Sequence, residues 1–140
     1  MPKKDKSAKP EDEDVPIRWE DDVAEHDYAA AQAYLSLKMT AAATDKLVAR
    51  LRKAKLTTRR ANDILRASGL TAAPLDDPGV VKDLIKVIEG KRLSPILVVG
   101  GAGRTEIADG FHRVSLIYRI DPDVDVPLKL AEVGRSATKG

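Results

Sequence analysis

The chain has 140 residues, of which 43% are hydrophobic and 33% are charged, and its formal net charge is +2. This length and apolar content suit one packed domain with a short appendage. The longest uncharged apolar stretch, near residues 95–103, is far shorter than the roughly 20 residues that span a bilayer, which excludes a transmembrane span. Cysteine is absent and histidine occurs only twice, so disulfides, thiolate zinc sites and cysteine nucleophiles are excluded and no metal centre is expected.

The N-terminus is charged and is followed by no apolar run, which is not typical of a secretory signal. We therefore expect a cytoplasmic protein without a membrane partner.

Charge is distributed unevenly along the chain. Residues 1–27 carry 5 basic and 10 acidic side chains, whereas residues 44–68 carry 8 basic and 2 acidic ones. Three interpretations stay open: a nucleic-acid-binding patch, an acidic tail folded back on a basic helix, and a solvated helical face.

The N-terminal half of the chain has helical patterns after a polar tail. Residues 1–16 hold almost no apolar groups and predict a disordered tail. From Trp19 the pattern changes, and a first helix is predicted by apolar residues that recur at helical spacing: Ala24, Tyr28, Ala31, Leu35 and Met39. A second helix is expected after an N-cap at Thr44 or Asp45, and a third from Thr57 or Thr58 to Gly69. These patterns predict a helical subdomain over residues 17–70.

The C-terminal half alternates helices and strands. Asp77, Pro78 and Gly79 after a linker over 71–77 form a helix-start signal, because Asp caps free amides and Pro needs no donor at the first helical position. The remaining elements are expected, in order, as a helix to Gly90, strands over 95–99 and 104–108 joined by the glycine loop 100–103, a helix over 111–120 and a strand over 126–131. The fold class is therefore α+β, a helical subdomain followed by an α-β-β-α-β module over 71–134, with 135–140 as a frayed end.

The most informative stretch is the segment 106–113, where a strand turns at Gly110 directly into a helix. Free backbone amides and the positive end of the helix dipole at this point, together with His112 and Arg113, are suited to an anion or phosphate. A structural interpretation stands beside it: Asp109 caps the helix, Phe111 is a core residue, and Arg113 is a surface ion-pair partner.

The order of motifs in residues 76–133 resembles the ParB/sulfiredoxin superfamily. The run Leu93–Val99, the hairpin loop, the segment 106–113 and the strand beginning Val126-Pro127 follow one another as they do in that superfamily. The resemblance implies a small α/β nucleotide-binding fold.

The resemblance carries over position by position at the start of the helix 111–120. Sulfiredoxins have a reactive cysteine where this chain has Phe111, so sulfinic-acid reduction by that route is excluded. Chromosome-partition ParB proteins have Gly-Glu-Arg-Arg; only Gly110 and Arg113 match, which puts a CTP clamp in doubt. The free-serine kinases of the superfamily have Asp-Gly-His-His-Arg, of which Asp109, Gly110, His112 and Arg113 match.

The leading functional expectation is a nucleotide- or phosphate-binding protein, an NTPase or phosphotransferase if it turns over, with ATP, ADP or CTP, and Mg²⁺ with the nucleotide, as its cofactors. Asp109 and His112 are the candidate catalytic residues. The candidate nucleotide-binding residues are Gly110, Phe111, His112, Arg113, Lys82 and Arg104.

Two alternatives come from different classes of protein. One is a DNA-binding or partition accessory that contacts phosphates through Arg50, Arg52, Arg59 and Arg60, with the acidic run 11–14 competing for that surface. The other is a non-catalytic interaction module.

Overall fold

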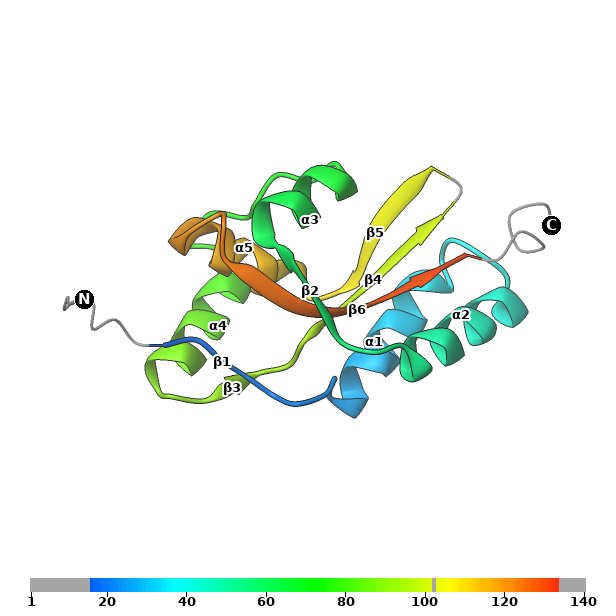
Figure 1. The fold of residues 1–140 in the computed structure, drawn as a ribbon, viewed down its shortest axis with the longest axis horizontal. Coiled ribbons are helices and arrows are strands. Elements are labelled where there is room, and N and C mark those ends of the chain that lie inside the picture. Colours follow the sequence, from blue (N-terminus) through cyan, green and yellow to red (C-terminus); the bar gives the residue numbers. More distant parts are fainter. Residues whose placement is uncertain (1–15, 102, 134–140) are drawn as a thin grey trace.

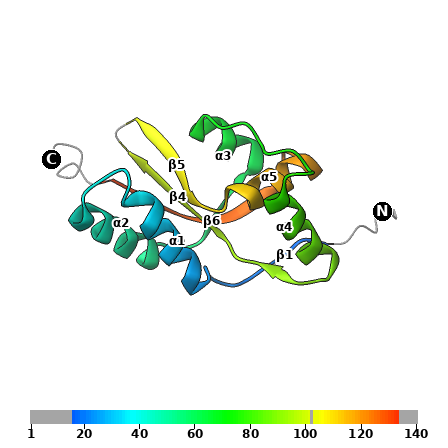
Figure 2. The same cartoon turned by 180° about the vertical axis from the view of Figure 1, so that it is seen from behind.

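The structure is a computed structural model that describes residues 16–101 and 103–133, and it is a mixed α+β fold (Figures 1 and 2). The two expected tails, 1–16 and 135–140, fall outside the described residues except for Pro16. The elements are, in chain order, β1 (Arg18–Trp19), α1 (Glu25–Leu35), α2 (Ala41–Lys53), β2 (Thr57–Arg60), α3 (Ala61–Ser68), α4 (Pro78–Ile88), β3 (Arg92–Leu93), β4 (Ile96–Gly101), β5 (Arg104–Asp109), α5 (Phe111–Ile120) and β6 (Asp125–Glu132).

A four-stranded sheet of order β2-β6-β4-β5 forms the centre of the fold. The strands β4 and β6 are parallel, with Ile96 opposite Leu128, and the other two pairings are antiparallel. Because side chains alternate along a strand, each face of the sheet buries its own apolar set. Leu97 packs with α1 and α2 on one face, and Val98 packs with α3 and α5 on the other. The sheet is thus the middle of three layers.

The prediction that the third helix starts at Thr57 or Thr58 is wrong. Residues 57–60 form β2, which pairs with β6, and α3 begins only at Ala61. The N-terminal half is therefore not purely helical, and two of the three buried clusters combine side chains from before and after residue 70. The threonines of β2 are β-branched and favour a strand, but the pairing partner lies about seventy residues away in sequence, which no local pattern reveals.

The first expected helix is confirmed: α1 begins at Glu25, after Trp19, which lies in β1. The second helix begins elsewhere than expected. Helix α2 is capped by Thr40, whose hydroxyl accepts from the amide of Ala43, and Thr44 is buried inside the helix.

The elements expected after residue 77 are confirmed. The Asp77 carboxylate accepts from the amides of Gly79 and Val80 at the start of α4, at 2.9 and 3.3 Å. The hairpin β4–β5, the helix α5 and the strand β6 follow in the predicted order. Gly69 ends α3 in the left-handed conformation, with φ 69°.

A small second sheet joins the N-terminal segment to the segment that precedes β4. The strand β1 pairs in parallel with β3, and the amide of Glu20 donates to the carbonyl of Leu93 at 2.8 Å. The amide of Ala24 then donates to the hydroxyl of Ser94 at 2.9 Å. These contacts hold the first turn of α1 beside the start of α5. None of the described helices is long and apolar enough to cross a membrane.

Candidate functional site

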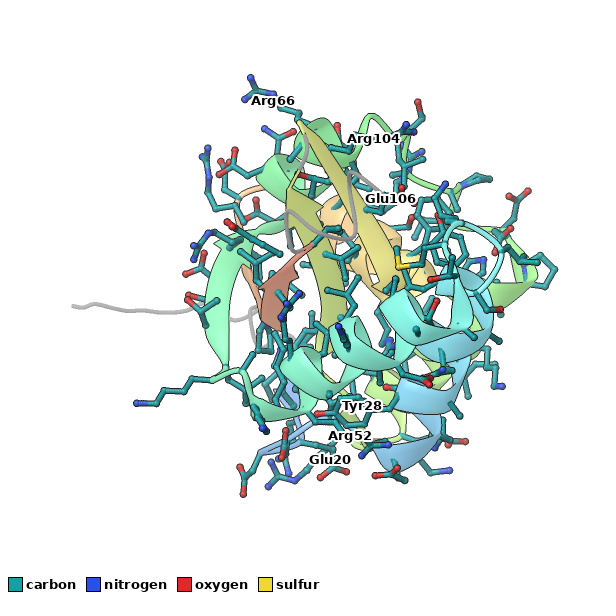
Figure 3. All side chains as sticks on the ribbon, turned by 90° about the vertical axis from the view of Figure 1, so that its right-hand side faces the viewer. Glu20, Tyr28, Arg52, Arg66, Arg104 and Glu106 are labelled. Carbon is teal, nitrogen blue, oxygen red and sulfur yellow. The ribbon has the colours of Figure 1, made fainter. Side chains whose placement is uncertain are left out.

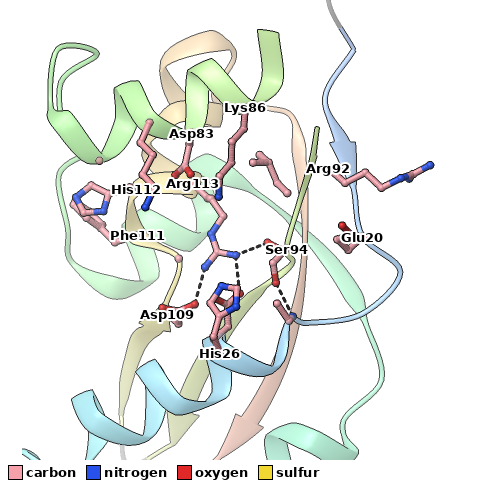
Figure 4. Close-up of a pocket in the computed structure, with 16 residues that line it drawn as sticks. Glu20, His26, Asp83, Lys86, Arg92, Ser94, Asp109, Phe111, His112 and Arg113 are labelled. Atoms are coloured by element: carbon pink, nitrogen blue, oxygen red, sulfur yellow. Dashed lines mark hydrogen bonds and ion pairs between the residues drawn. The ribbon is translucent and has the colours of Figure 1, made fainter. Parts of the chain in front are cut away.

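A cavity of about 410 Å³ lies where α4, β3 and the beginnings of α1 and α5 meet (Figure 4). Five of the residues predicted to bind nucleotide line it: Lys82, Gly110, Phe111, His112 and Arg113. Asp109 lines it as well. The cavity walls therefore come from elements that are distant in the sequence.

Arg113 makes more hydrogen bonds than any other side chain that lines the cavity. Its guanidinium donates to Asp27 at 3.0 Å, to Asp109 at 2.6 Å and to the carbonyl of Ser94 at 2.6 Å (Figure 4). Only 12% of the side chain is exposed. Arg113 is thus not a surface ion-pair partner: its charge is neutralised inside the protein by two carboxylates, and it joins α1, β5 and the segment before β4.

The two carboxyl groups that bond Arg113, those of Asp27 and Asp109, differ in acidity. Burial raises the pKa of Asp109 to about 6, against the attraction of Arg113 and with the help of the negative charge of Asp27. Burial acts in the same direction on Asp27, but hydrogen bonds from Ser94 and Arg113 hold the pKa of Asp27 below its ordinary value. Of these two carboxyl groups, Asp109 therefore takes up a proton at the higher pH and is the candidate for proton exchange with a ligand.

The prediction that Asp109 caps α5 is wrong. The N-cap is Gly110, with φ 114°, and no side chain caps this end because the Asp109 carboxylate bonds Arg113 instead. A Cβ at Gly110 would lie 2.4 Å from Cγ2 of Ile96, so only glycine fits this turn. The amides of Phe111 and His112 have no hydrogen-bond acceptor among the described residues.

The imidazole of His112 lies against the first turn of α4. Its Nε2 is 3.3 Å from the carboxylate of Asp77, and a Cβ at Gly79 would lie 2.6 Å from the ring. Half of the His112 side chain is exposed. The carboxylate that caps α4 therefore also orients the imidazole. Phe111 packs partly buried against two apolar clusters, in agreement with its interpretation as a core residue.

Helix α4 contributes most of the remaining charge. Lys82, Asp83 and Lys86 line the cavity, and Figure 4 shows Asp83 and Lys86 extending from α4 toward Arg113. Burial raises the pKa of Asp83, and nearby cations oppose this shift. No carboxylate of residues 16–101 and 103–133 forms an ion pair with Lys82 or Lys86. Arg92 also lines the cavity, but it donates to the carbonyl of Trp19 and its guanidinium points away from Arg113 in Figure 4.

Arg104 does not join this cavity. It starts β5, five residues before Asp109, which at about 3.4 Å per residue places it roughly 17 Å away along the strand. Arg104 lines two other hollows, on the outer part of the hairpin. In the described part of the chain no cluster of three or more His, Asp and Glu side chains could hold a metal ion.

The four arginines of the DNA-binding alternative lie on two different elements. Arg50 and Arg52 belong to α2, and Arg59 and Arg60 to β2. Arg52 forms a two-pronged ion pair with Glu25 and lies over the ring of Tyr28 (Figure 3), and Arg60 pairs with Asp63 and Asp123. Arg50 and Arg59 donate to backbone carbonyls at 3.1 and 2.8 Å. The acidic run 11–14 lies outside the described residues.

Several residues of the cavity were not predicted from the sequence, among them Asp27, Ser94 and Lys86. Asp27 is 5% exposed although it lies beside His26, whose side chain is 85% exposed. The partner of Asp27 is 86 residues away, so no spacing could reveal it. Lys86 could have been found, because it lies one helical turn after Lys82 on the same face.

Comparison with protein-family models, with curated proteins and with solved structures finds no match for this chain.

Proposed function

We propose that this protein binds the phosphate groups of a nucleotide in the cavity between α4 and α5. The proposal rests on the beginning of α5: Phe111 and His112 line the cavity together with Lys82 and Lys86, and their amides have no acceptor among the described residues. Such amides carry partial positive charge and accept an anion at little cost. The element order from α4 to β6 also supports the ParB/sulfiredoxin-like module that the resemblance implies.

In this site Arg113 is a positioning residue and does not itself bind phosphate. Because two carboxylates already neutralise its guanidinium, Arg113 positions Asp109 and the start of α5, and the two lysines of α4 supply the charge for phosphate. His112, held by Asp77, and Asp109, with a pKa of about 6, lie in the same cavity and are the groups available for proton transfer.

The test is a calorimetric titration of the full chain with ADP. The variant Lys82→Glu/Lys86→Glu reverses both cavity lysines, and Lys46→Glu/Lys53→Glu reverses two exposed lysines of α2 as a control with the same net charge. Loss of charge-assisted contacts worth about 1.5–3 kcal/mol predicts an affinity roughly ten- to hundredfold lower for the first variant. The control should bind like the parent. Equal loss in both variants, or a parent that binds no ADP, contradicts the proposal.

A further inference from the structure

Strand β5 is an edge strand of the central sheet, and its outer side is unpaired among the described residues. The strand is the last one in the order β2-β6-β4-β5, and among the described strands it pairs only with β4. Within the described ranges, no other backbone or side chain hydrogen-bonds to the main chain of residues 104–109. An edge of this kind presents N–H and C=O groups at every second residue, which is the template for one further strand.

Two helices make this edge into a groove. The hollow has a volume of about 370 Å³ and is lined by β5, by Tyr34 of α1, by Lys38 in the turn after α1, and by residues 66–70 at the end of α3. Glu106 and Ile107 both line it, although they face opposite sides of the sheet. The hollow therefore follows the edge of the sheet rather than one of its faces, and α1 and α3 flank the edge without covering it.

The groove has an excess of positive charge. Lys38, Arg66 and Arg104 line it, and Glu106 is the one carboxylate in its lining. Glu106 is already bound, since it accepts from the Tyr34 hydroxyl at 2.5 Å and pairs with Lys38 at 3.2 Å. Arg66 is 73% exposed and lies 3.9 Å from Asp63, and Arg104 has no ion pair within the described part of the chain. Figure 3 shows Arg66, Arg104 and Glu106 together at this end of the molecule.

We propose that the β5 edge binds an extended acidic segment of another protein as a fifth strand of the sheet. The backbone groups of β5 supply the hydrogen bonds, and Arg66 and Arg104 select the acidic side chains. The two termini of this chain are less suitable occupants of the groove than a segment of another protein. The acidic run 11–14 precedes β1, which lies at the opposite end of the molecule from the hairpin tip (Figure 1), and residues 134–140 carry Arg and Lys but no acid.

The test uses the full chain and three synthetic eight-residue peptides. The first alternates Glu and Val, the second replaces each Glu by Lys, and the third places Pro at alternate positions to remove half of the strand donors. Backbone amide NMR shifts and hydrogen exchange report where each peptide binds. The Glu peptide should shift the amides of residues 104–109 and slow their exchange, and the other two peptides should not.

A pair of charge variants completes the test. Arg66→Glu/Arg104→Glu should weaken binding of the Glu peptide by roughly tenfold, while Lys46→Glu/Lys53→Glu should keep it. Equal binding of the Lys peptide, or shifts confined to other elements, would overturn the proposal. Faster exchange of the β5 amides after deletion of residues 1–15 would also overturn it, because the occupant would then be the protein's own tail.

Discussion

Replacing Asp109 by asparagine removes a partly buried carboxyl whose pKa the fold raises to about 6, well above the ordinary value for aspartate. A raised pKa means that the folded state binds the proton more tightly than the unfolded chain does. This proton therefore stabilises the parent at low pH, and the stabilisation is lost as pH rises through 6. Asparagine does not titrate, so the stability of the variant does not fall in this way as pH rises.

The size of the effect follows from the pKa of Asp109 in the folded protein, about 6, and its ordinary value in the unfolded chain. Between pH 4.5 and 7.5 the parent should lose about 2 kcal/mol that the Asp109→Asn variant keeps. The free energy of unfolding of the variant, relative to the parent, should therefore rise by that amount over this range. Urea denaturation of both proteins at the two pH values measures the difference.

A second substitution separates titration from lost contacts. Asp109→Ala removes the same proton site and also the hydrogen bond to Arg113, so it should begin at lower stability and follow the same change with pH. A stability difference that stays constant with pH in both variants, or that moves the other way, would refute the raised pKa and with it the assignment of the proton to Asp109.

Three further outcomes follow from the packing. Gly110→Ala should lower the free energy of unfolding by about 2–4 kcal/mol, because the residue has φ 114° and its Cβ would meet Ile96; an unchanged melting temperature would contradict this. Lys129→Met should cost about 1–3 kcal/mol in denaturant titrations, because Nζ of this 4% exposed side chain bonds Tyr28, Asp22 and the carbonyl of Arg52. Glu25→Gln, which breaks the exposed pair with Arg52, should leave the melting temperature nearly unchanged, and a large drop would show a structural role for that pair.

Local signals in the sequence predicted the C-terminal half well. Asp77 and Pro78 fix the start of α4, because the carboxylate and the ring act on residues directly after them. Gly110 at the junction of β5 and α5 was identified for the same reason, since a turn of this kind depends on neighbouring residues. Caps and tight turns can be predicted because their energetics are contained within a few residues.

The missed features depend on contacts between distant segments. Residues 57–60 form a strand only because β6 offers an edge, and Asp27 is a site residue only because the pairing of β1 with β3 brings α1 beside Arg113. The interpretation of Asp109 as the cap of α5 failed for a related reason. A carboxylate before a helix usually caps it, but here a guanidinium one turn later is the stronger partner.

The most direct test of nucleotide binding is the backbone amide spectrum of the full chain during titration with ATP, ADP and CTP in the presence of Mg²⁺. We expect saturable shifts of the backbone amides of Phe111 and His112, which are uncapped at the start of α5. The backbone amides of Lys82 and Lys86 should shift with them. Unchanged amides at the start of α5 under all three nucleotides, or shifts concentrated in α2 and β2, would contradict it.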